Sequence, residues 1–159
     1  MPEEENKNRI LVAVDFSDDS SSALRYAANL AKRLNDDLIV LHVIHDQGGS
    51  PGYYTDKRLK KGEKKRLKRL EEIASEMMDE FIRKLIDDHP EIKGVLKKAE
   101  LMLISGLTVT KILQVVEKTA PELLVLGNRG RTSLKHILLG SKAEQLARLC
   151  QIPVTLVKQ

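Results

Sequence analysis

Cysteine, aromatic residues and long apolar runs are all scarce in this chain. Cys150 is the only cysteine among 159 residues, so neither an internal disulfide nor a cysteine-based metal cluster can form. Five side chains are aromatic and none is tryptophan, which argues against a stacking platform for single-stranded nucleic acid. No apolar run reaches the roughly 18 to 20 residues that span a bilayer, and the acidic start of the chain is unlike a signal peptide. We therefore expect a cytoplasmic protein without a membrane span.

The positive charge of the chain is concentrated in one segment. The formal net charge is +4, but residues 57–69 hold nine basic side chains and one acid, so the remainder carries about −4. The solvated start of a helix explains such a run, and no aromatic or amide side chains are interleaved to read bases. We therefore do not expect a nucleic-acid partner, and an electrostatic patch for nucleic acid or anionic lipid stays open as the alternative.

Apolar runs of strand length alternate with segments of helical periodicity. This alternation implies right-handed crossovers, so we expect a doubly wound α/β fold with a parallel sheet and helices on both faces. The length and the apolar content of 42% suit one domain, which we place at 9–159 behind a flexible tail at 1–8. The predicted strands are 10–14, 38–44, 99–104, 123–126 and 154–157. The predicted helices are 20–34, 67–86, 107–120 and 141–150. The N-terminus of the first helix is expected to be capped by Asp18, Asp19 or Ser20.

A glycine motif follows the fourth predicted strand. Its spacing is G-x2-G-x9-G-[ST], with glycines at 127, 130 and 140 and a serine at 141. Gly127 would let backbone approach a ligand, and Gly130 can take the positive φ of a turn that cradles phosphate. In doubly wound sheets, ligands bind beyond the carboxyl ends of the strands, where the strand order reverses. The motif therefore predicts a phosphate site, although a plain turn followed by a helix start explains the spacing equally well.

The nine residues between the second and third glycines are expected to bring these two glycines together. Their apolar side chains have helical spacing and predict about two turns packed on the domain. Gly140 and Ser141 then open the last helix, whose unpaired N–H groups and positive dipole end suit a phosphate. The stretch from Ser141 to Glu144 also matches a capping box, in which the serine hydroxyl binds the helix's own backbone. The apolar side chains are Leu134, Ile137 and Leu138, and Arg129 and Arg131 add positive charge nearby.

The glycine motif and three further segments resemble the universal stress protein family, and in particular its ATP-binding subgroup. The resemblance extends from Arg9 to Lys158. It implies an adenine-nucleotide alpha-hydrolase-like fold with five parallel strands in the order 3-2-1-4-5. In that order, Asp15 and Gly127 would face each other across the crevice at the switch point. The three segments are Val-Asp15-Phe-Ser17, Leu-His42-Val43-Ile and Ile-Pro153-Val.

The resemblance also implies the ligand and the residues that bind it. The ligand would be ATP, with ADP and AMP as alternatives, and Mg or Mn would be bound through the phosphates. Asp15 would lie near the ribose or the metal-bound phosphates, although this residue also suits a cap on the following helix. The backbone of Val43 would meet the edge of the adenine. The other implied binding residues are Leu126, Gly127, Arg129, Gly130, Gly140 and Ser141, with the first helix amides at Lys142 and Ala143.

Some residues depart from the usual pattern of that family or fall outside its site. Asn128 stands where a small hydroxyl residue or alanine is usual, and Leu107 stands where an acidic residue often follows the third strand. His42 is expected to be a satisfied core or rim histidine. His136 is expected to be an exposed neighbour of the phosphates. No residue is assigned a catalytic role.

The lack of three catalytic motifs favours binding over catalysis. The chain has no G-x4-G-K-[ST] loop, no G-x-G-x-x-G and no H-E-x-x-H pair. We therefore expect a regulatory module of the stress response. In this module ATP would order the loop from Gly127 to Ser141, and an unknown protein partner would recognise the ordered loop. The alternatives are a slow ATPase with Asp15 as base or metal ligand, a nucleotide-independent dimeric interaction protein, and a binder of nucleic acid or lipid through 57–69. The resemblance further implies a homodimer through the edge strand 154–157.

Overall fold

The sheet predicted from the sequence is present in the structure. The computed structural model describes residues 7–45, 63–130, 136 and 138–159, without the side chains of 63–68. The strands are β1 (Arg9–Ala13), β2 (Asp37–Ile44), β3 (Glu100–Ser105), β4 (Leu123–Gly127) and β5 (Val154–Val157). They pair in parallel in the order β3-β2-β1-β4-β5. The doubly wound α/β fold and the strand order are therefore confirmed.

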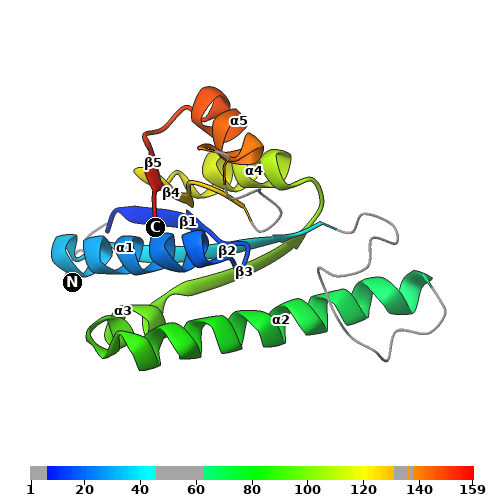
Figure 1. Ribbon diagram of the computed structural model, residues 1–159, viewed down its shortest axis with the longest axis horizontal. Helices are drawn as coiled ribbons and strands as arrows, with labels where there is room; N and C mark the ends of the chain where they lie inside the picture. Colours follow the sequence, from blue (N-terminus) through cyan, green and yellow to red (C-terminus); the bar gives the residue numbers. More distant parts are fainter. Residues whose placement is uncertain (1–6, 46–62, 131–135, 137) are drawn as a thin grey trace, which may run out of the picture.

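Helices cover both faces of this sheet (Figure 1). On β1, Ile10 and Val12 pack toward α1, α2 and α3, whereas Leu11 packs toward α4 and α5. Central strands that are buried on both faces need a continuous apolar run, which is what the sequence of β1 shows. The helices are α1 (Asp18–Leu34), α2 (Glu63–Asp88), the short 3-10 helix η1 (Pro90–Ile92), α3 (Lys93–Lys98), α4 (Thr108–Thr119) and α5 (Ser141–Leu149).

The first helix begins at a different cap from the three predicted. The N-cap of α1 is Ser17, whose hydroxyl oxygen accepts a hydrogen bond from the backbone N–H of Ser20 at 3.1 Å. Asp18 and Asp19 lie instead in the first turn, where the helix dipole favours carboxylates. The predicted caps are therefore wrong by one to three residues. The carboxylate of Asp19 is consequently available for another contact.

The second helix is longer than predicted. Because α2 begins at Glu63, the second half of the basic segment 57–69 is helical, but its side chains up to residue 68 and all of 57–62 lie outside the described residues. The helix ends at Asp88, two residues before Pro90, whose missing N–H prevents continuation. The short helices η1 and α3 were not predicted, because three and six residues are too few to show a period.

The tail predicted at 1–8 lies outside the described residues up to residue 6. Its last residue is already part of the fold, since the carbonyl of Asn8 accepts a hydrogen bond from the N–H of Asp37 at 2.9 Å. Among the helices of the described ranges, none is both long enough and apolar enough to cross a bilayer.

Candidate functional site

The loops after β1 and β4 meet at the carboxyl edge of the sheet. Ala13 pairs with Leu126 at the ends of these neighbouring strands. Asp15 follows β1, and its Oδ2 lies 3.2 Å from the position that a Cβ would take on Gly130. The structure thus brings Asp15 against the second glycine of the motif. That Asp15 would also face Gly127 across the crevice stays a prediction.

Gly127 serves packing between β4 and α1. A Cβ on Gly127 would lie 2.8 Å from the main-chain carbon of Asp19 and 3.0 Å from the nitrogen of Ser20. The first turn of α1 therefore occupies the space that the prediction reserved for a ligand. The φ of Gly130 lies outside the left-handed range, so the turn geometry predicted for it is also wrong. At Gly130, the lack of a side chain instead leaves room beside Asp15.

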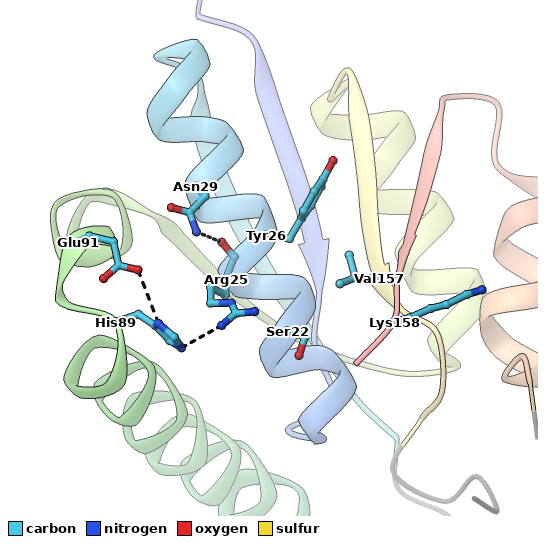
Figure 2. A pocket seen from close by; sticks show the side chains of 8 residues that line it. All are labelled: Ser22, Arg25, Tyr26, Asn29, His89, Glu91, Val157 and Lys158. Carbon is cyan, nitrogen blue, oxygen red and sulfur yellow. Dashed lines mark hydrogen bonds and ion pairs between the residues drawn. The ribbon is translucent and has the colours of Figure 1, made fainter. Parts of the chain in front are cut away.

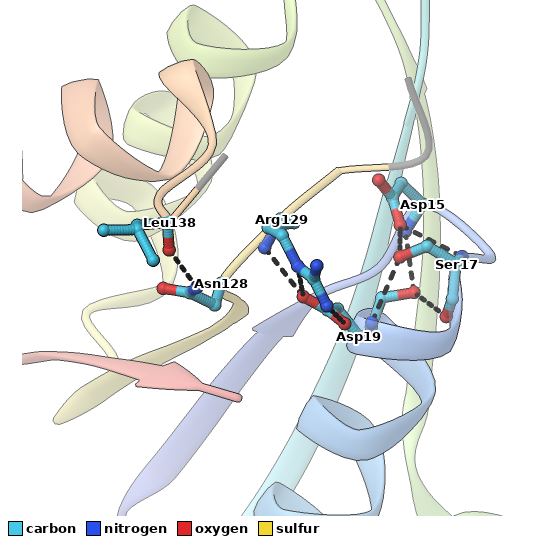
Figure 3. A network of polar contacts seen from close by, with 7 residues as sticks. Asp15, Ser17, Asp19, Asn128, Arg129 and Leu138 are labelled. Atoms are coloured by element: carbon cyan, nitrogen blue, oxygen red, sulfur yellow. Dashed lines mark hydrogen bonds and ion pairs between the residues drawn. The ribbon is translucent and has the colours of Figure 1, made fainter. Parts of the chain in front are cut away.

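The third glycine returns to the first two, as predicted. The N–H of Gly140 donates to the carbonyl of Asn128 at 2.8 Å, and a Cβ on Gly140 would lie 3.4 Å from the nitrogen of Gly130. Asn128 is 8% exposed, and its side-chain amide donates to the carbonyl of Leu138 (Figure 3). The asparagine that departs from the usual family residue thus holds the returning segment by its backbone.

The spacer between the second and third glycines is described only in part. Leu138 is 89% exposed, so its predicted packing on the domain is wrong. The physical reason is that the backbone carbonyl of this residue, rather than its side chain, is held against the domain. His136 is exposed, as expected. Leu134, Ile137 and Arg131 lie outside the described residues.

The last helix begins without a side-chain cap. The N-cap of α5 is Gly140, and the first intrahelical bond runs from the N–H of Glu144 to the Gly140 carbonyl at 2.9 Å. Ser141 is the first residue of the helix rather than its cap, so the predicted capping box is absent from these described residues. The N–H groups of 141–143 precede the first intrahelical bond and carry the partial positive charge of the helix end. This end of α5 can therefore attract an anion.

The loop that carries Asp15 is held from two sides. Oδ1 of Asp15 accepts hydrogen bonds from the backbone N–H of Ser17 at 3.1 Å and from the Ser17 hydroxyl (Figure 3). Asp15 thus supports the cap residue of α1, which bears out in part the alternative of a helix cap. His42 is 1% exposed, its Nδ1 donates to the carbonyl of Val14 at 2.8 Å, and its ring lies 4.3 Å from that of Phe16. The prediction of a satisfied core histidine is confirmed.

Arg129 contacts a buried carboxylate that the sequence did not indicate. Its backbone N–H donates to Oδ2 of Asp19 at 3.0 Å, and its Nε and Nη2 donate to Oδ2 and Oδ1 at 3.2 and 3.3 Å (Figure 3). Asp19 is 5% exposed. Sequence reasoning considered Asp19 only as a cap, and no local pattern signals a pair 110 residues apart. Arg129, predicted to line the phosphates, is therefore held by an ion pair with Asp19.

The backbone at Val43 lies where β2 extends past β1. The N–H of Val14 donates to the carbonyl of Leu41 at 2.8 Å, and beyond Leu41 the described residues of β2 pair only with β3. Backbone groups two residues apart along a strand point the same way. The N–H and C=O of Val43 therefore point to the side on which β1 has ended.

The remaining predicted residues surround this region. Leu126 and Ala143 are buried, so both can offer a ligand only backbone groups. Ser141 and Lys142 are exposed, and Nζ of Lys142 lies 3.4 Å from the hydroxyl of Thr108 at the start of α4. The predicted residues thus converge on the ends of β1, β2 and β4 and the start of α5.

A hollow of about 370 Å³ lies elsewhere, beside α1 (Figure 2). His89 bridges opposite charges there, with Nε2 3.4 Å from Nη1 of Arg25 and Nδ1 3.6 Å from Oε1 of Glu91. Arg25 and Glu91 thus lie on the two sides of the His89 ring. None of the predicted binding residues is among those that line it, which are Ser22, Arg25, Tyr26, Asn29, His89, Glu91, Val157 and Lys158.

Comparison with known proteins identifies the family. The model of the universal stress protein family matches residues 7–158. The chain belongs to the universal stress protein family. A curated family member, universal stress protein YxiE of Bacillus subtilis (strain 168), is 32% identical over 154 residues, which cover 95% of this chain and 99% of that protein.

Solved universal stress proteins share the fold of this chain. One in complex with cAMP has a TM-score of 0.65 at 20% identity, covering 95% of this chain and 97% of the other. Another, from Archaeoglobus fulgidus and in complex with dAMP, has a TM-score of 0.57 at 19% identity, covering 95% and 98%. The likeness shows that this universal stress protein has the adenine-nucleotide alpha-hydrolase-like fold.

Proposed function

We propose that this universal stress protein binds an adenine nucleotide, in the first place ATP, at the carboxyl ends of β1 and β4. The observation that carries the proposal is the meeting of Asp15, Gly130 and Gly140 beside the start of α5, which has no side-chain cap. A helix start of this kind is a general phosphate site. Two solved proteins of the same fold are in complex with cAMP and dAMP, which supports an adenine nucleotide over other phosphates.

The backbone N–H groups of the motif are divided between the protein and the proposed ligand. The N–H groups of Asn128, Arg129 and Gly140 donate to Val157, Asp19 and Asn128 respectively. A buried N–H group normally makes one hydrogen bond. These three N–H groups therefore hold the loop together and are not assigned to the ligand. The phosphates would therefore bind at the amides of 141–143, and Gly130 would supply the space.

Groups of this chain also match the adenine and the ribose of the nucleotide. The backbone of Val43, which points past the end of β1, would meet the edge of the adenine, as base edges are read by hydrogen bonds. Asp15 would lie at the ribose or at Mg or Mn carried by the phosphates, since a carboxylate oxygen is the kind of ligand that Mg²⁺ prefers. A bound metal would neutralise phosphate charge next to this acid. ADP and AMP remain alternative ligands.

The proposed role is a regulatory one in the cytoplasm, in which an unknown protein partner reads the bound state. Asp15 is the candidate base for hydrolysis, and its Oδ1 already accepts two hydrogen bonds from Ser17. This arrangement favours binding over turnover. A slow ATPase is the second candidate, and multiple turnovers of phosphate release by the purified protein would establish it.

Replacement of Gly130 by valine is expected to weaken ATP binding at least tenfold. The valine Cβ would lie 3.2 Å from Oδ2 of Asp15, and its methyl groups would fill the space assigned to the phosphates. Because φ of Gly130 is not left-handed, valine does not have to adopt a left-handed backbone there, and the loss would report on the space beside Asp15. The measurement is mass spectrometry of nucleotide released by denaturation, followed by calorimetric titration with ATP, ADP and AMP. The control is Gly94→Val in α3. If the Gly130 variant bound ATP as tightly as this control and the wild type, the proposed site would be refuted.

We also propose a homodimer through β5. This strand lies at the edge of the sheet, and all four of its residues are half-buried. The carbonyls of Pro153 and Val157 bind β4, so the backbone of Val154 and Leu156 faces the open edge. The β5 strand of a second copy, running antiparallel, would form hydrogen bonds with these backbone groups. Sedimentation should give twice the chain mass for the wild type and the chain mass for Val154→Pro, which removes one edge N–H. A monomeric wild type would contradict this proposal.

A further inference from the structure

The contact between Asp19 and Arg129 joins the first turn of α1 to the turn inside the glycine motif (Figure 3). The carboxylate accepts three hydrogen bonds from one residue, one from its main chain and two from its guanidinium. The carboxylate side chain is 6% exposed and the arginine side chain 31%. This is therefore a largely desolvated ion pair, in which the buried carboxylate of Asp19 depends on Arg129 for its charge balance.

The three hydrogen bonds fix different parts of Arg129. The main-chain bond sets the orientation of the peptide between Asn128 and Arg129, and hence the turn that leads to Gly130. The two bonds to the guanidinium set the plane of that group, because Arg donors have a rigid fork geometry. The missing Cβ of Gly127 lets α1 approach closely enough for these bonds to form. The turn and the cation are thus held in one arrangement before any ligand arrives.

We propose that Asp19 is a positioning residue that selects for the phosphate chain of the nucleotide. This inference rests on the proposed function. Asp19 acts through Arg129, holding it and the turn from 127 to 130 in the conformation that receives the phosphates beyond the first. A preorganised cation binds these phosphates without the cost of ordering the loop. The adenine would bind at Val43, on the β2 side of β1, whereas the turn follows β4 on the other side.

This placement predicts a nucleotide-selective effect of Asp19→Asn. The variant keeps the shape of the side chain, removes its charge and turns one acceptor into a donor that faces the guanidinium. ATP affinity should fall about tenfold, which corresponds to the loss of one charge-assisted hydrogen bond. AMP affinity should change less than twofold. Both affinities are measured by calorimetry on the full chain, and Asp18→Asn, an exposed acid in the same turn, is the matched control that should change neither.

A double substitution separates positioning from a general loss of structure. If Asp19 acts through Arg129, then Asp19→Asn should change ATP affinity less than twofold in an Arg129→Gln background, where both charges are gone. Arg129→Gln alone should show the same ATP-selective loss, and it serves as the test if Asp19→Asn does not fold. Stability of each variant is followed by thermal unfolding without ligand.

Three results would overturn the inference. Equal losses of ATP and AMP affinity would show that the pair only supports the fold, and the proposed function would stand. Tighter ATP binding by Asp19→Asn would show that the carboxylate repels phosphate instead of preparing the site. If the wild type binds neither nucleotide, the proposed function fails and this inference fails with it.

Discussion

Replacement of Gly127 by alanine is expected to destabilise the domain by about 2 kcal/mol, a typical cost of inserting atoms into a packed interior. The new Cβ would lie 2.8 Å from the main-chain carbon of Asp19 and 3.0 Å from the nitrogen of Ser20. These are backbone atoms in the first turn of α1, so they cannot move away without displacing the helix from β4. The free energy of unfolding is measured by urea denaturation followed by far-ultraviolet circular dichroism.

The matched control is the same substitution at Gly94. A Cβ on Gly94 would meet no atom within 4 Å, and the residue lies in α3. Alanine there should leave the stability unchanged or raise it by roughly 0.5 to 1 kcal/mol, since glycine is a poor helix former. If both variants were equally stable, the close packing of β4 on α1 would not be the reason for glycine at 127.

Replacement of His42 by alanine is expected to have a larger effect, about 3 to 5 kcal/mol, as for other large buried rings. The imidazole is 1% exposed, and its ring packs against that of Phe16. Nδ1 must carry a hydrogen, because the Val14 carbonyl that it contacts can only accept. Alanine would leave both a cavity and a buried carbonyl without this donor. The measurement is again equilibrium urea denaturation.

Two further variants separate the contributions of His42. His42→Asn keeps a donor near the position of Nδ1 but loses the ring, so its stability should fall between those of the wild type and the alanine variant. His136→Ala removes an exposed imidazole and should change the stability by less than about 0.5 kcal/mol. Equal stability of the asparagine and alanine variants would assign the whole effect to ring packing.

The fold was predictable to the extent that it follows from local patterns. The strand 10–14 is a short continuous apolar run and the helix 20–34 shows its period within one segment, so their type and approximate bounds were predicted correctly. The short helices η1 and α3 contain too few residues for a period and were missed. The strand order came from the family resemblance rather than from periodicity, and the structure confirms it.

The candidate site was predictable in its place but not in its contacts. The glycine spacing located the loop after β4, and Gly140 does return to Asn128. The reason proposed for Gly127 was wrong, because the nearest atoms to that glycine belong to a helix more than 100 residues earlier in the chain. The pairing of Asp19 with Arg129 was not predicted for the same reason. Both contacts depend on how α1 lies over β4.

The sequence by itself determined the class of the fold, the family and the position of the glycine motif, since periodicity and spacing are local properties of a chain. Only the tertiary structure decided which groups of that motif hold the protein together and which face the proposed ligand. Asp15 came to lie against Gly130, and Arg129 was paired with a buried acid. The physical reason is that hydrogen bonds and close packing join groups by distance in space, which the order of residues along the chain does not specify.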